Sequence, residues 1–459
     1  MKKAGRYLAG ELHSHTHLTD GRHTQEELLV KAFDDYHLDF YINAEHGGTT
    51  KKTPFGRELV KPIPRWQSLK TSLQIINYMR MKYEDKILLQ GLEWNVPGHE
   101  HMGMAIYEDE ENSMSDFEYI FGRGNEKDTS RLNEGLLKFN KTHEDAVRGA
   151  KFLQDRYSGK SYLFFNHPSR ALIYPIHQMR DFNNVAPDVC FGFEGMPGYQ
   201  KKPIRGHYYI EHGKELNYKA RTYGGADYML AKIGGGWDAL LGEGRRFFVY
   251  QGCDFHHERS SFWPGEYTKT YVYTDEHSEL GLIDGIRSGN VYIVQGDLIK
   301  TLEFTISYYN KEATMGEEIT VSNGANVTIA LRYKSPEINN NGDRVKVDHI
   351  DLIMGEVTEI REPGTEAYNQ DINPTAEIIK IFTNKDWTLD DDGFYSMTYT
   401  FEATKNQYFR LRGTNQRIGD SSYLDQEGNP KMDPFNESTE KMAWENLWFY
   451  SNPIFLHVE

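Results

Sequence analysis

The fold of this chain is decided by the stretch Leu-His-Ser-His-Thr-His-Leu-Thr-Asp-Gly (residues 12–21), which follows the apolar segment at residues 7–9. The apolar segment predicts a strand, and alternation along its extended continuation places the three histidines on one face. His13 and His15 are two residues apart, so both imidazoles can bind one metal ion. Asp20 offers a hard oxygen to the same ion or to a neighbouring one. The stretch therefore predicts a metal site at a strand end.

Later apolar runs repeat this arrangement, because each has a metal-ligand side chain at or beside one of its ends. These side chains are Glu45, His46, Glu93, His99, Glu100, His101, His167, Glu194, Asp254 and His256. A barrel of parallel strands gathers its strand ends at one rim. Histidines scattered over a surface would not coincide with strand ends in this way. The spacing thus predicts one cluster at one end of an α/β fold.

The order of these motifs is His-x-His-x3-Thr-Asp-Gly, His-Gly, Gly-x-Glu, His, His-Pro and Asp-x-His. It resembles the polymerase and histidinol phosphatase (PHP) superfamily of metal-dependent phosphoesterases, over roughly residues 6–298. The resemblance implies a distorted seven-stranded, TIM-like β/α barrel in residues 1–299. It also implies two or three divalent metal ions at the C-terminal rim of that barrel.

The resemblance implies nine metal ligands: His13, His15, Asp20, His46, Glu93, His101, His167, Asp254 and His256. The third-motif histidine could be His99 or His101, and we prefer His101 because it directly precedes an apolar strand. The family usually has Asp before the second-motif histidine, where this chain has Glu45.

Nine ligands exceed the needs of one ion, since structural zinc takes four and catalytic zinc usually takes three from the protein. We therefore expect a trinuclear site in which the Glu93 carboxylate bridges two ions. The ligand types do not choose among Zn, Mn and Fe. Such a site generates hydroxide near neutral pH and neutralises phosphate oxygens, so Glu93, Asp254 and His256 are the expected catalytic residues.

Three arginines are candidates for contact with the substrate phosphate, because a guanidinium fork matches phosphate oxygens. Arg170 follows His167-Pro168, and Arg205 and Arg259 lie on expected rim loops. Each could instead be a surface arginine in an ion pair. Arg205 falls in the long, Tyr-rich connection at residues 195–236, which is typical of a lid or substrate wall but also of a solvated loop.

From about residue 300 the apolar period changes to two, as at Leu302, Phe304 and Ile306, and Gly/Asn/Asp turns separate the runs. Short alternating strands with such turns predict an Ig-like β-sandwich over residues 300–459. We find no ligand cluster there. The sandwich is expected to pack on the barrel, and a carbohydrate-binding or surface-binding role is the alternative.

The composition limits partners and compartment. With 52 basic and 68 acidic residues among 459, the net charge of −16 argues against a nucleic-acid-binding surface. Cys190 and Cys253 are expected to be buried free thiols rather than a disulfide or metal ligands. No apolar segment follows the lysines at residues 2–3, and none could span a bilayer. We expect a soluble protein, cytoplasmic or, after removal of a signal peptide, periplasmic or secreted; the oligomeric state stays open.

The sequence thus predicts a metal-dependent hydrolase that cleaves a phosphoester of a small phosphorylated molecule by a metal-activated hydroxide. Whether the substrate is a monoester or a diester stays open. One alternative is a multi-metal hydrolase of C–N or C–O bonds, because similar sites polarise carbonyl groups. The other is a non-catalytic, metal-stabilised binding protein.

Overall fold

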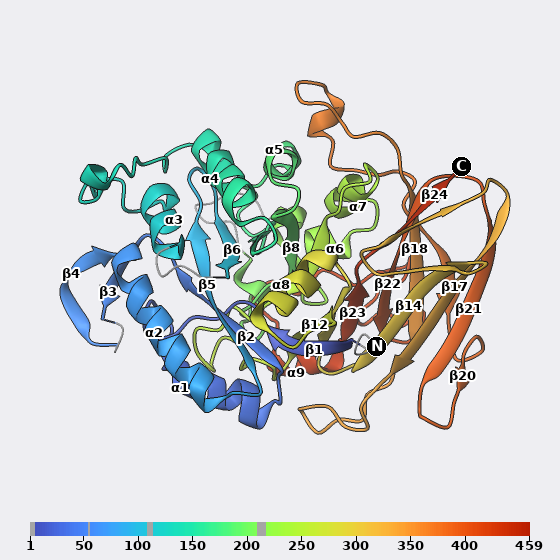
Figure 1. The fold of residues 1–459 in the computed structure, drawn as a ribbon. Coiled ribbons are helices and arrows are strands. Elements are labelled where there is room, and N and C mark those ends of the chain that lie inside the picture. The colour runs from blue at the N-terminus through green and yellow to red at the C-terminus, as the bar shows by residue number, and fades with distance from the viewer. Residues whose placement is uncertain (1–4, 54–55, 108–112, 209–216) are drawn as a thin grey trace.

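The computed structural model describes residues 5–53, 56–107, 113–208 and 217–459. The chain folds into a mixed α/β structure around one large sheet, with a second sheet formed by its C-terminal part (Figure 1). In the view of Figure 1, the strands and helices of the N-terminal part lie to the left and the C-terminal sheets to the right.

Seven strands of the N-terminal part form one continuous path in the order β11-β8-β7-β6-β5-β2-β1. Neighbours are parallel except at β6, which runs antiparallel to both β5 and β7. Only residues 96–100 connect β5 to β6, too short a connection for a parallel crossover. The seven strands are β1 (Arg6–Glu11), β2 (Phe40–His46), β5 (Ile87–Asn95), β6 (His101–Ile106), β7 (Ser161–Phe165), β8 (Cys190–Met196) and β11 (Phe248–Gln251).

The predicted closed barrel is not found in the part of the chain that the structure describes. The outer edge of β1 pairs antiparallel with β12 (Thr268–Thr274), which continues through β13 (Val291–Gln295) into the C-terminal strands. No ladder joins β11 to these described strands; side chains reach it instead, as where Val249 N donates to Asn452 Oδ1 (2.7 Å). A barrel was expected because the strand ends share one rim; here the continuations of β1 and β11 meet only at an isolated parallel bridge between Ser14 and Phe255, not in a ladder.

Helices pack around these seven strands, and their ends follow from local sequence. Thr24 caps α1 in a reciprocal box with Glu27, and Thr142 caps α4 in the same way with Asp145. The helices of this part are α1 (Gln25–Leu29), the π-helical turn η1 (Val30–Asp35), α2 (Trp66–Lys82), α3 (Ser113–Phe121), η2 (Leu132–Glu134), α4 (His143–Tyr157), α5 (Ile176–Val185), η3 (Arg205–His207), η4 (Tyr218–Ala220), α6 (Tyr228–Ala231), α7 (Gly236–Leu241) and α8 (Glu279–Ser288).

Two small strand pairs lie outside the main path: β3 (Thr49–Lys52) with β4 (Glu58–Pro64), and β9 (Thr222–Tyr223) with β10 (Ala226–Asp227). The second pair and three short helices occupy much of the connection at residues 195–236, which was predicted to be irregular. Residues 209–216 of that connection lie outside the described residues, as do residues 2–3.

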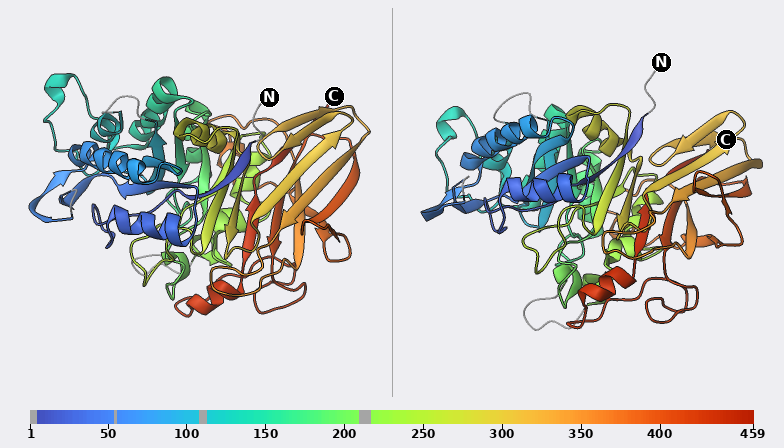
Figure 2. Two further views of the ribbon diagram at one scale, coloured as in Figure 1. Left: turned by 60° about the horizontal axis from the view of Figure 1, so that its bottom comes forward. Right: turned by 90° about the horizontal axis from the view of Figure 1, so that it is seen from below.

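The C-terminal part contains two sheets, which Figure 2 shows from two directions, and side chains of both belong to one apolar cluster. The core takes Phe304 and Ile329 from one sheet and Leu352 and Phe409 from the other, each fully buried. The first sheet is β15 (Lys311–Thr314), β14 (Thr301–Tyr308), β17 (Ala325–Lys334), β21 (Tyr395–Ala403) and β20 (Thr388–Leu389). The second contains β23 (Trp448–Ser451), β22 (Gln407–Thr414), β18 (His349–Glu356), β19 (Glu377–Phe382), β24 (Ile454–Val458) and β16 (Glu318–Val321), with η5 (Ala367–Asn369) and α9 (Glu440–Glu445) in its connections.

The second C-terminal sheet is continuous with the N-terminal one, because β13 pairs with β23 and Tyr292 lies opposite Ser451. A buried ion pair between Asp238 of α7 and Arg410 of β22 also crosses this junction. The predicted division at residues 299 and 300 stays a prediction, and the two parts share backbone pairing and buried charge. None of the helices in the described ranges combines the length and apolarity needed to cross a bilayer.

Candidate metal centre

The first-motif histidines are held where β1 and β11 end side by side. The Glu11 carboxylate accepts hydrogen bonds from the backbone N–H groups of Leu12 (3.0 Å), His13 (2.7 Å) and Cys253 (2.8 Å). Gly252 lies so close to His13 that a side chain at this position would collide with it. These contacts place the first motif beside the Asp-x-His motif, although more than 200 residues separate them in the sequence.

The remaining predicted ligands reach the same rim from neighbouring strands. His46 is the last residue of β2, Glu93 lies near the end of β5, and His167 and Asp254 follow β7 and β11. His101 is the first residue of β6. Because β6 is antiparallel, its start lies beside the ends of the parallel strands, which is why this histidine joins the cluster.

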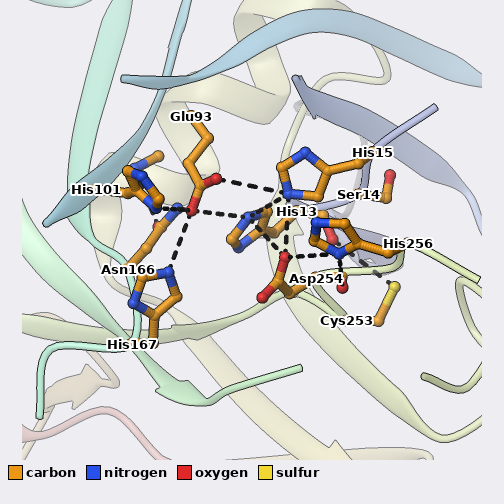
Figure 3. A network of polar contacts seen from close by, with 12 residues as sticks. His13, Ser14, His15, Glu93, His101, Asn166, His167, Cys253, Asp254 and His256 are labelled. Carbon is orange, nitrogen blue, oxygen red and sulfur yellow. Dashed lines mark hydrogen bonds and ion pairs between the residues drawn. The ribbon is translucent and has the colours of Figure 1, made fainter. Parts of the chain in front are cut away.

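Glu93 lies at the centre of the cluster and is 1 % exposed (Figure 3). Its Oε1 lies 3.2 Å from His13 Nε2, 3.1 Å from His101 Nδ1 and 3.2 Å from His167 Nε2. Its Oε2 lies 2.7 Å from His46 Nδ1. One carboxylate is thus shared by imidazoles from four different segments of the chain.

Asp254 forms a second centre, on the other side of His13 and His15 in Figure 3. Its Oδ1 lies 3.0 Å from His15 Nε2, 3.4 Å from His13 Nε2 and 3.5 Å from His256 Nδ1. Asp20 closes the outer side, with its Oδ2 3.2 Å from His256 Nε2 and its side chain 54 % exposed. The cluster is therefore buried on the Glu93 side and open to solvent beside Asp20.

Three overlapping sets of side chains each bring at least three potential ligand atoms within 4.8 Å of one another. They are His13 with His15 and Asp254, then His46 with Glu93 and His101, and finally His15 with Asp20, His46 and His256. Eight of the nine predicted ligands belong to these sets, and the ninth, His167, contacts Glu93 as described above. The structure brings all nine predicted residues together.

The protonation states of two buried histidines suit metal binding. Burial, together with the positive charges of His256 and His46, lowers the pKa of His15 to about 3. Burial and the neighbouring Arg170 lower the pKa of His167 to about 4. Both imidazoles are neutral at pH 7, and the neutral ring is the form that binds metal.

The carboxylates of the cluster are ionised despite burial. Burial opposes the charge on Glu93, but His101, His13 and His46 hold its pKa well below the ordinary value. Burial likewise disfavours a charged His13, yet Asp254 and the other nearby carboxylates raise its pKa well above normal. Protons on some imidazoles thus balance the carboxylates here, and metal cations would replace those protons.

Hydrogen bonding within the cluster leaves atoms of the kind that bind metal unused. His15 Nδ1 and His167 Nδ1 are buried and make no hydrogen bond to any described residue. Buried polar atoms are rarely left without a partner, because their desolvation is costly. The nitrogen and oxygen donor set therefore fits divalent transition-metal ions.

The backbone at this rim adopts left-handed conformations that non-glycine residues rarely accept. His167 has φ of 31°, Asp254 has φ of 42°, and Tyr199 has φ of 56°. Such conformations each cost about 1–3 kcal/mol and concentrate at functional sites. Here they aim side chains into the cluster just after a strand has ended.

Several residues of the site were not predicted as ligands. Glu194 Oε1 lies 3.1 Å from His13 Nδ1, and its Oε2 accepts from the backbone N–H of His167. Asn166 donates to Glu93 Oε1 (3.1 Å). Glu194 did show a signal, since it ends an apolar run, but the motif order offered no place for it. Nothing in the sequence around Asn166, apart from its position next to His167, predicted that it would contact Glu93.

Tyr199 comes from the Tyr-rich connection and lies over the rim. Its hydroxyl is 3.1 Å from His256 Nδ1, and the two rings are stacked with centroids 5.1 Å apart. His17, expected on the same face as His13 and His15, belongs to none of the three ligand sets. The extended segment ends before it, so alternation no longer applies.

The three predicted phosphate-binding arginines have different surroundings. Arg170 lies beside the cluster, with its guanidinium 3.8 Å from Asp254 Oδ2 and 3.0 Å from Glu100 Oε1. Arg259 is exposed on the turn after His256. Arg205 is 3 % exposed and is bound by Gln200, Tyr267 and Asp433. This buried, fully partnered position speaks against the predicted phosphate contact of Arg205, because a substrate would have to displace protein partners.

Both cysteines are buried and free, as predicted. Cys253 directly precedes Asp254, but neither thiol belongs to a ligand set. Burial raises the pKa of Cys190 well above its ordinary value, so this group stays an uncharged thiol.

Comparison with known proteins gives little beyond this geometry. No protein-family model matches the sequence, and a search of curated proteins finds no match. Among solved structures, the chain is similar to a two-domain protein from Bacteroides vulgatus ATCC 8482, described as containing a predicted PHP-like metal-dependent phosphoesterase. That similarity covers 93 % of this chain and 94 % of the other at 12 % identity, with a TM-score of 0.38. A TM-score this low does not establish a common fold.

Proposed function

We propose that this protein is a metal-dependent hydrolase that cleaves a phosphoester bond of a small phosphorylated molecule. The observation that carries the proposal is the Glu93-centred cluster, in which imidazoles from separate strands converge on one buried carboxylate. The PHP-like motif order adds the reaction class. We also propose that residues 300–459 form an Ig-like β-sandwich, since residues of two sheets share one apolar cluster there.

We further propose that all nine predicted ligands hold two or three ions of Zn, Mn or Fe. When bound, such ions supply Lewis acidity, which activates water and offsets the negative charge on phosphate. The three overlapping ligand sets support more than one ion, because they span both the Glu93 side and the Asp254 side of the cluster.

Residues around the ligands would fix their orientation. Glu194 accepts from His13 Nδ1, which leaves His13 Nε2 directed at Glu93 and Asp254. Tyr199 holds the ring of His256 by stacking and by its hydroxyl at Nδ1. Arg170, beside Asp254, would bind non-bridging oxygens of the substrate phosphate through its guanidinium fork.

Metal analysis tests the first part of this proposal. Protein purified without chelator should carry more than one equivalent of transition metal, measured by elemental mass spectrometry. Its removal with chelator should lower the melting temperature, because ions that bind only the folded state stabilise it. One equivalent or less in undepleted protein would contradict the multinuclear site.

Activity assays test the second part. With added Mn or Zn, p-nitrophenyl phosphate or bis-p-nitrophenyl phosphate should be hydrolysed, and a panel of carboxylic esters and amides should not. Preference for the ester or amide panel would favour the C–N or C–O hydrolase instead. Full metal loading without any hydrolysis would favour a metal-stabilised binding protein.

Arg170→Ala should raise KM for a phosphoester about tenfold or more while metal content stays unchanged. A hydrogen bond to a charged group contributes about 1.5–3 kcal/mol, which corresponds to this range. Arg170→Lys is the matched control, since it keeps the charge but loses the fork and should recover only part of the affinity. Kinetics identical to those of the unmodified protein would remove Arg170 from the site.

A further inference from the structure

Three turns meet on the open side of the metal centre, next to His256. The backbone N–H of Arg22 donates to the carbonyl of His256 (2.9 Å), and that of Lys201 donates to the carbonyl of Ser260 (3.1 Å). The N–H of Lys202 donates to the carbonyl of Tyr199 (3.1 Å), whose hydroxyl contacts His256. Backbone hydrogen bonds thus fix the turn after Asp20, the turn after Tyr199 and the turn after His256 against one another.

Each of these turns carries one cation without an ion pair to a described residue: Arg22, Lys202 and Arg259; Lys201, the other lysine of its turn, pairs with Glu440 (3.3 Å). Arg22 and Arg259 are exposed and Lys202 is half-buried, and none of the three forms an ion pair with a described residue. Glu258, the residue before Arg259, is bound by His23 at 2.9 Å. We call Arg22, Lys202 and Arg259 the rim cations. They are notable in a chain with a net charge of −16, since most of its surface repels anions.

His257 lies on the same turn as Arg259, directly after His256. Its Nδ1 accepts from the backbone N–H of Arg259 (3.3 Å). The backbone of Arg22 bonds to His256 and that of Arg259 to His257, so two of the three cation-bearing turns meet at these adjacent histidines.

We propose that the rim cations bind a second anionic group of the substrate, so that the substrate class is a small phosphoester with a further phosphate or carboxylate. This inference rests on the proposed function, because it assumes that the reacting phosphate lies at the metal centre. Two guanidinium groups and one ammonium group suit a multi-oxygen anion. Their partial exposure means that the attraction should weaken with rising salt concentration.

Three substrates with the same six-carbon chain test this proposal: hexyl phosphate, hexane-1,6-diyl bisphosphate and 6-phosphooxyhexanoate. Two of these compounds carry a second anionic group. The unmodified protein should hydrolyse at least one of them with about tenfold higher kcat/KM than hexyl phosphate. Comparison of those two compounds decides whether the second group is a phosphate or a carboxylate. The preference should decline between low and high salt.

In the variant Arg22→Gln/Lys202→Gln/Arg259→Gln, kcat/KM for the preferred compound should fall close to kcat/KM for hexyl phosphate. The metal content should stay unchanged. The control Lys346→Gln/Lys385→Gln/Arg417→Gln removes three exposed positive charges from the C-terminal part and should retain the preference. The control thus separates a local site from a general effect of net charge.

The inference would be overturned if the unmodified protein had similar kcat/KM values for all three compounds, or if the rim variant kept the preference for a second anionic group. Hydrolysis of hexyl phosphate would still uphold the proposed function in either case. If none of the compounds is hydrolysed, the proposed function fails, and binding measured by calorimetry decides the inference. Hexane-1,6-diyl bisphosphate should then still bind about tenfold more tightly than hexyl phosphate, and only in proteins that retain the rim cations.

Discussion

Glu93→Gln should lower turnover on a phosphoester by on the order of 10² or more and should cost the protein at least one metal ion. Glutamine keeps the size of the side chain and one acceptor oxygen but removes the negative charge. Among the residues that the structure describes, Glu93 is the only carboxylate that faces His13, His46, His101 and His167 together. Cations held close together repel one another, and this carboxylate is the group that offsets the repulsion.

Elemental analysis and steady-state kinetics on the same preparation check this result. Glu118→Gln is the matched control, because Glu118 is also a buried carboxylate near the rim but belongs to no ligand set. Burial raises the pKa of Glu118 to about 7, so the loss of its charge is a small change. Full metal occupancy and near-normal turnover in Glu93→Gln would show that the ligand assignment is wrong at its centre.

Asp238→Ala should destabilise the whole chain by about 3–5 kcal/mol, the usual effect of removing one partner of a buried ion pair. Asp238 and Arg410 are both fully buried, and the two side chains meet through two contacts of 2.8 and 2.9 Å. Asp238 also accepts from the hydroxyl of Tyr408 (2.9 Å). Without the carboxylate, an uncompensated guanidinium would remain between α7 and β22.

Urea denaturation followed by two spectroscopic probes measures this effect. Both probes should shift to lower urea together, because the ion pair joins the N-terminal and C-terminal parts. Asp155→Ala is the control: its pair with Lys151 is exposed, and such pairs contribute about 0–1 kcal/mol. Equal shifts for Asp238→Ala and Asp155→Ala would contradict the structural role of the buried pair.

Much of the candidate site could be predicted from sequence, because it depends on a local rule that repeats. A short apolar run followed by His, Asp or Glu marks a strand end, and parallel strands bring such ends to one edge. His46, His167 and Asp254 follow this rule directly. His101 follows it in reverse, since the short connection after β5 makes β6 antiparallel and turns its first residue toward the same rim.

Other features of the site depend on contacts between distant segments. Arg205 was predicted from its place in a loop, yet its guanidinium is bound by Asp433 from the C-terminal part. Tyr199 reaches His256 only because its backbone is left-handed at that position. Neither the partner of a charged side chain nor the sign of one φ angle is encoded in residue spacing.

The sequence by itself determined the mixed α/β class, the period change near residue 300 and the convergence of ligand-bearing strand ends, because each follows from periodicity and residue type in a short window. Only the tertiary structure decided that the strand path stays open and continues from β13 into β23. It also decided that Glu194 supports His13 and that three turns meet beside His256. These features arise when segments far apart in the chain pack together, and no local pattern specifies which of many possible partners each segment meets.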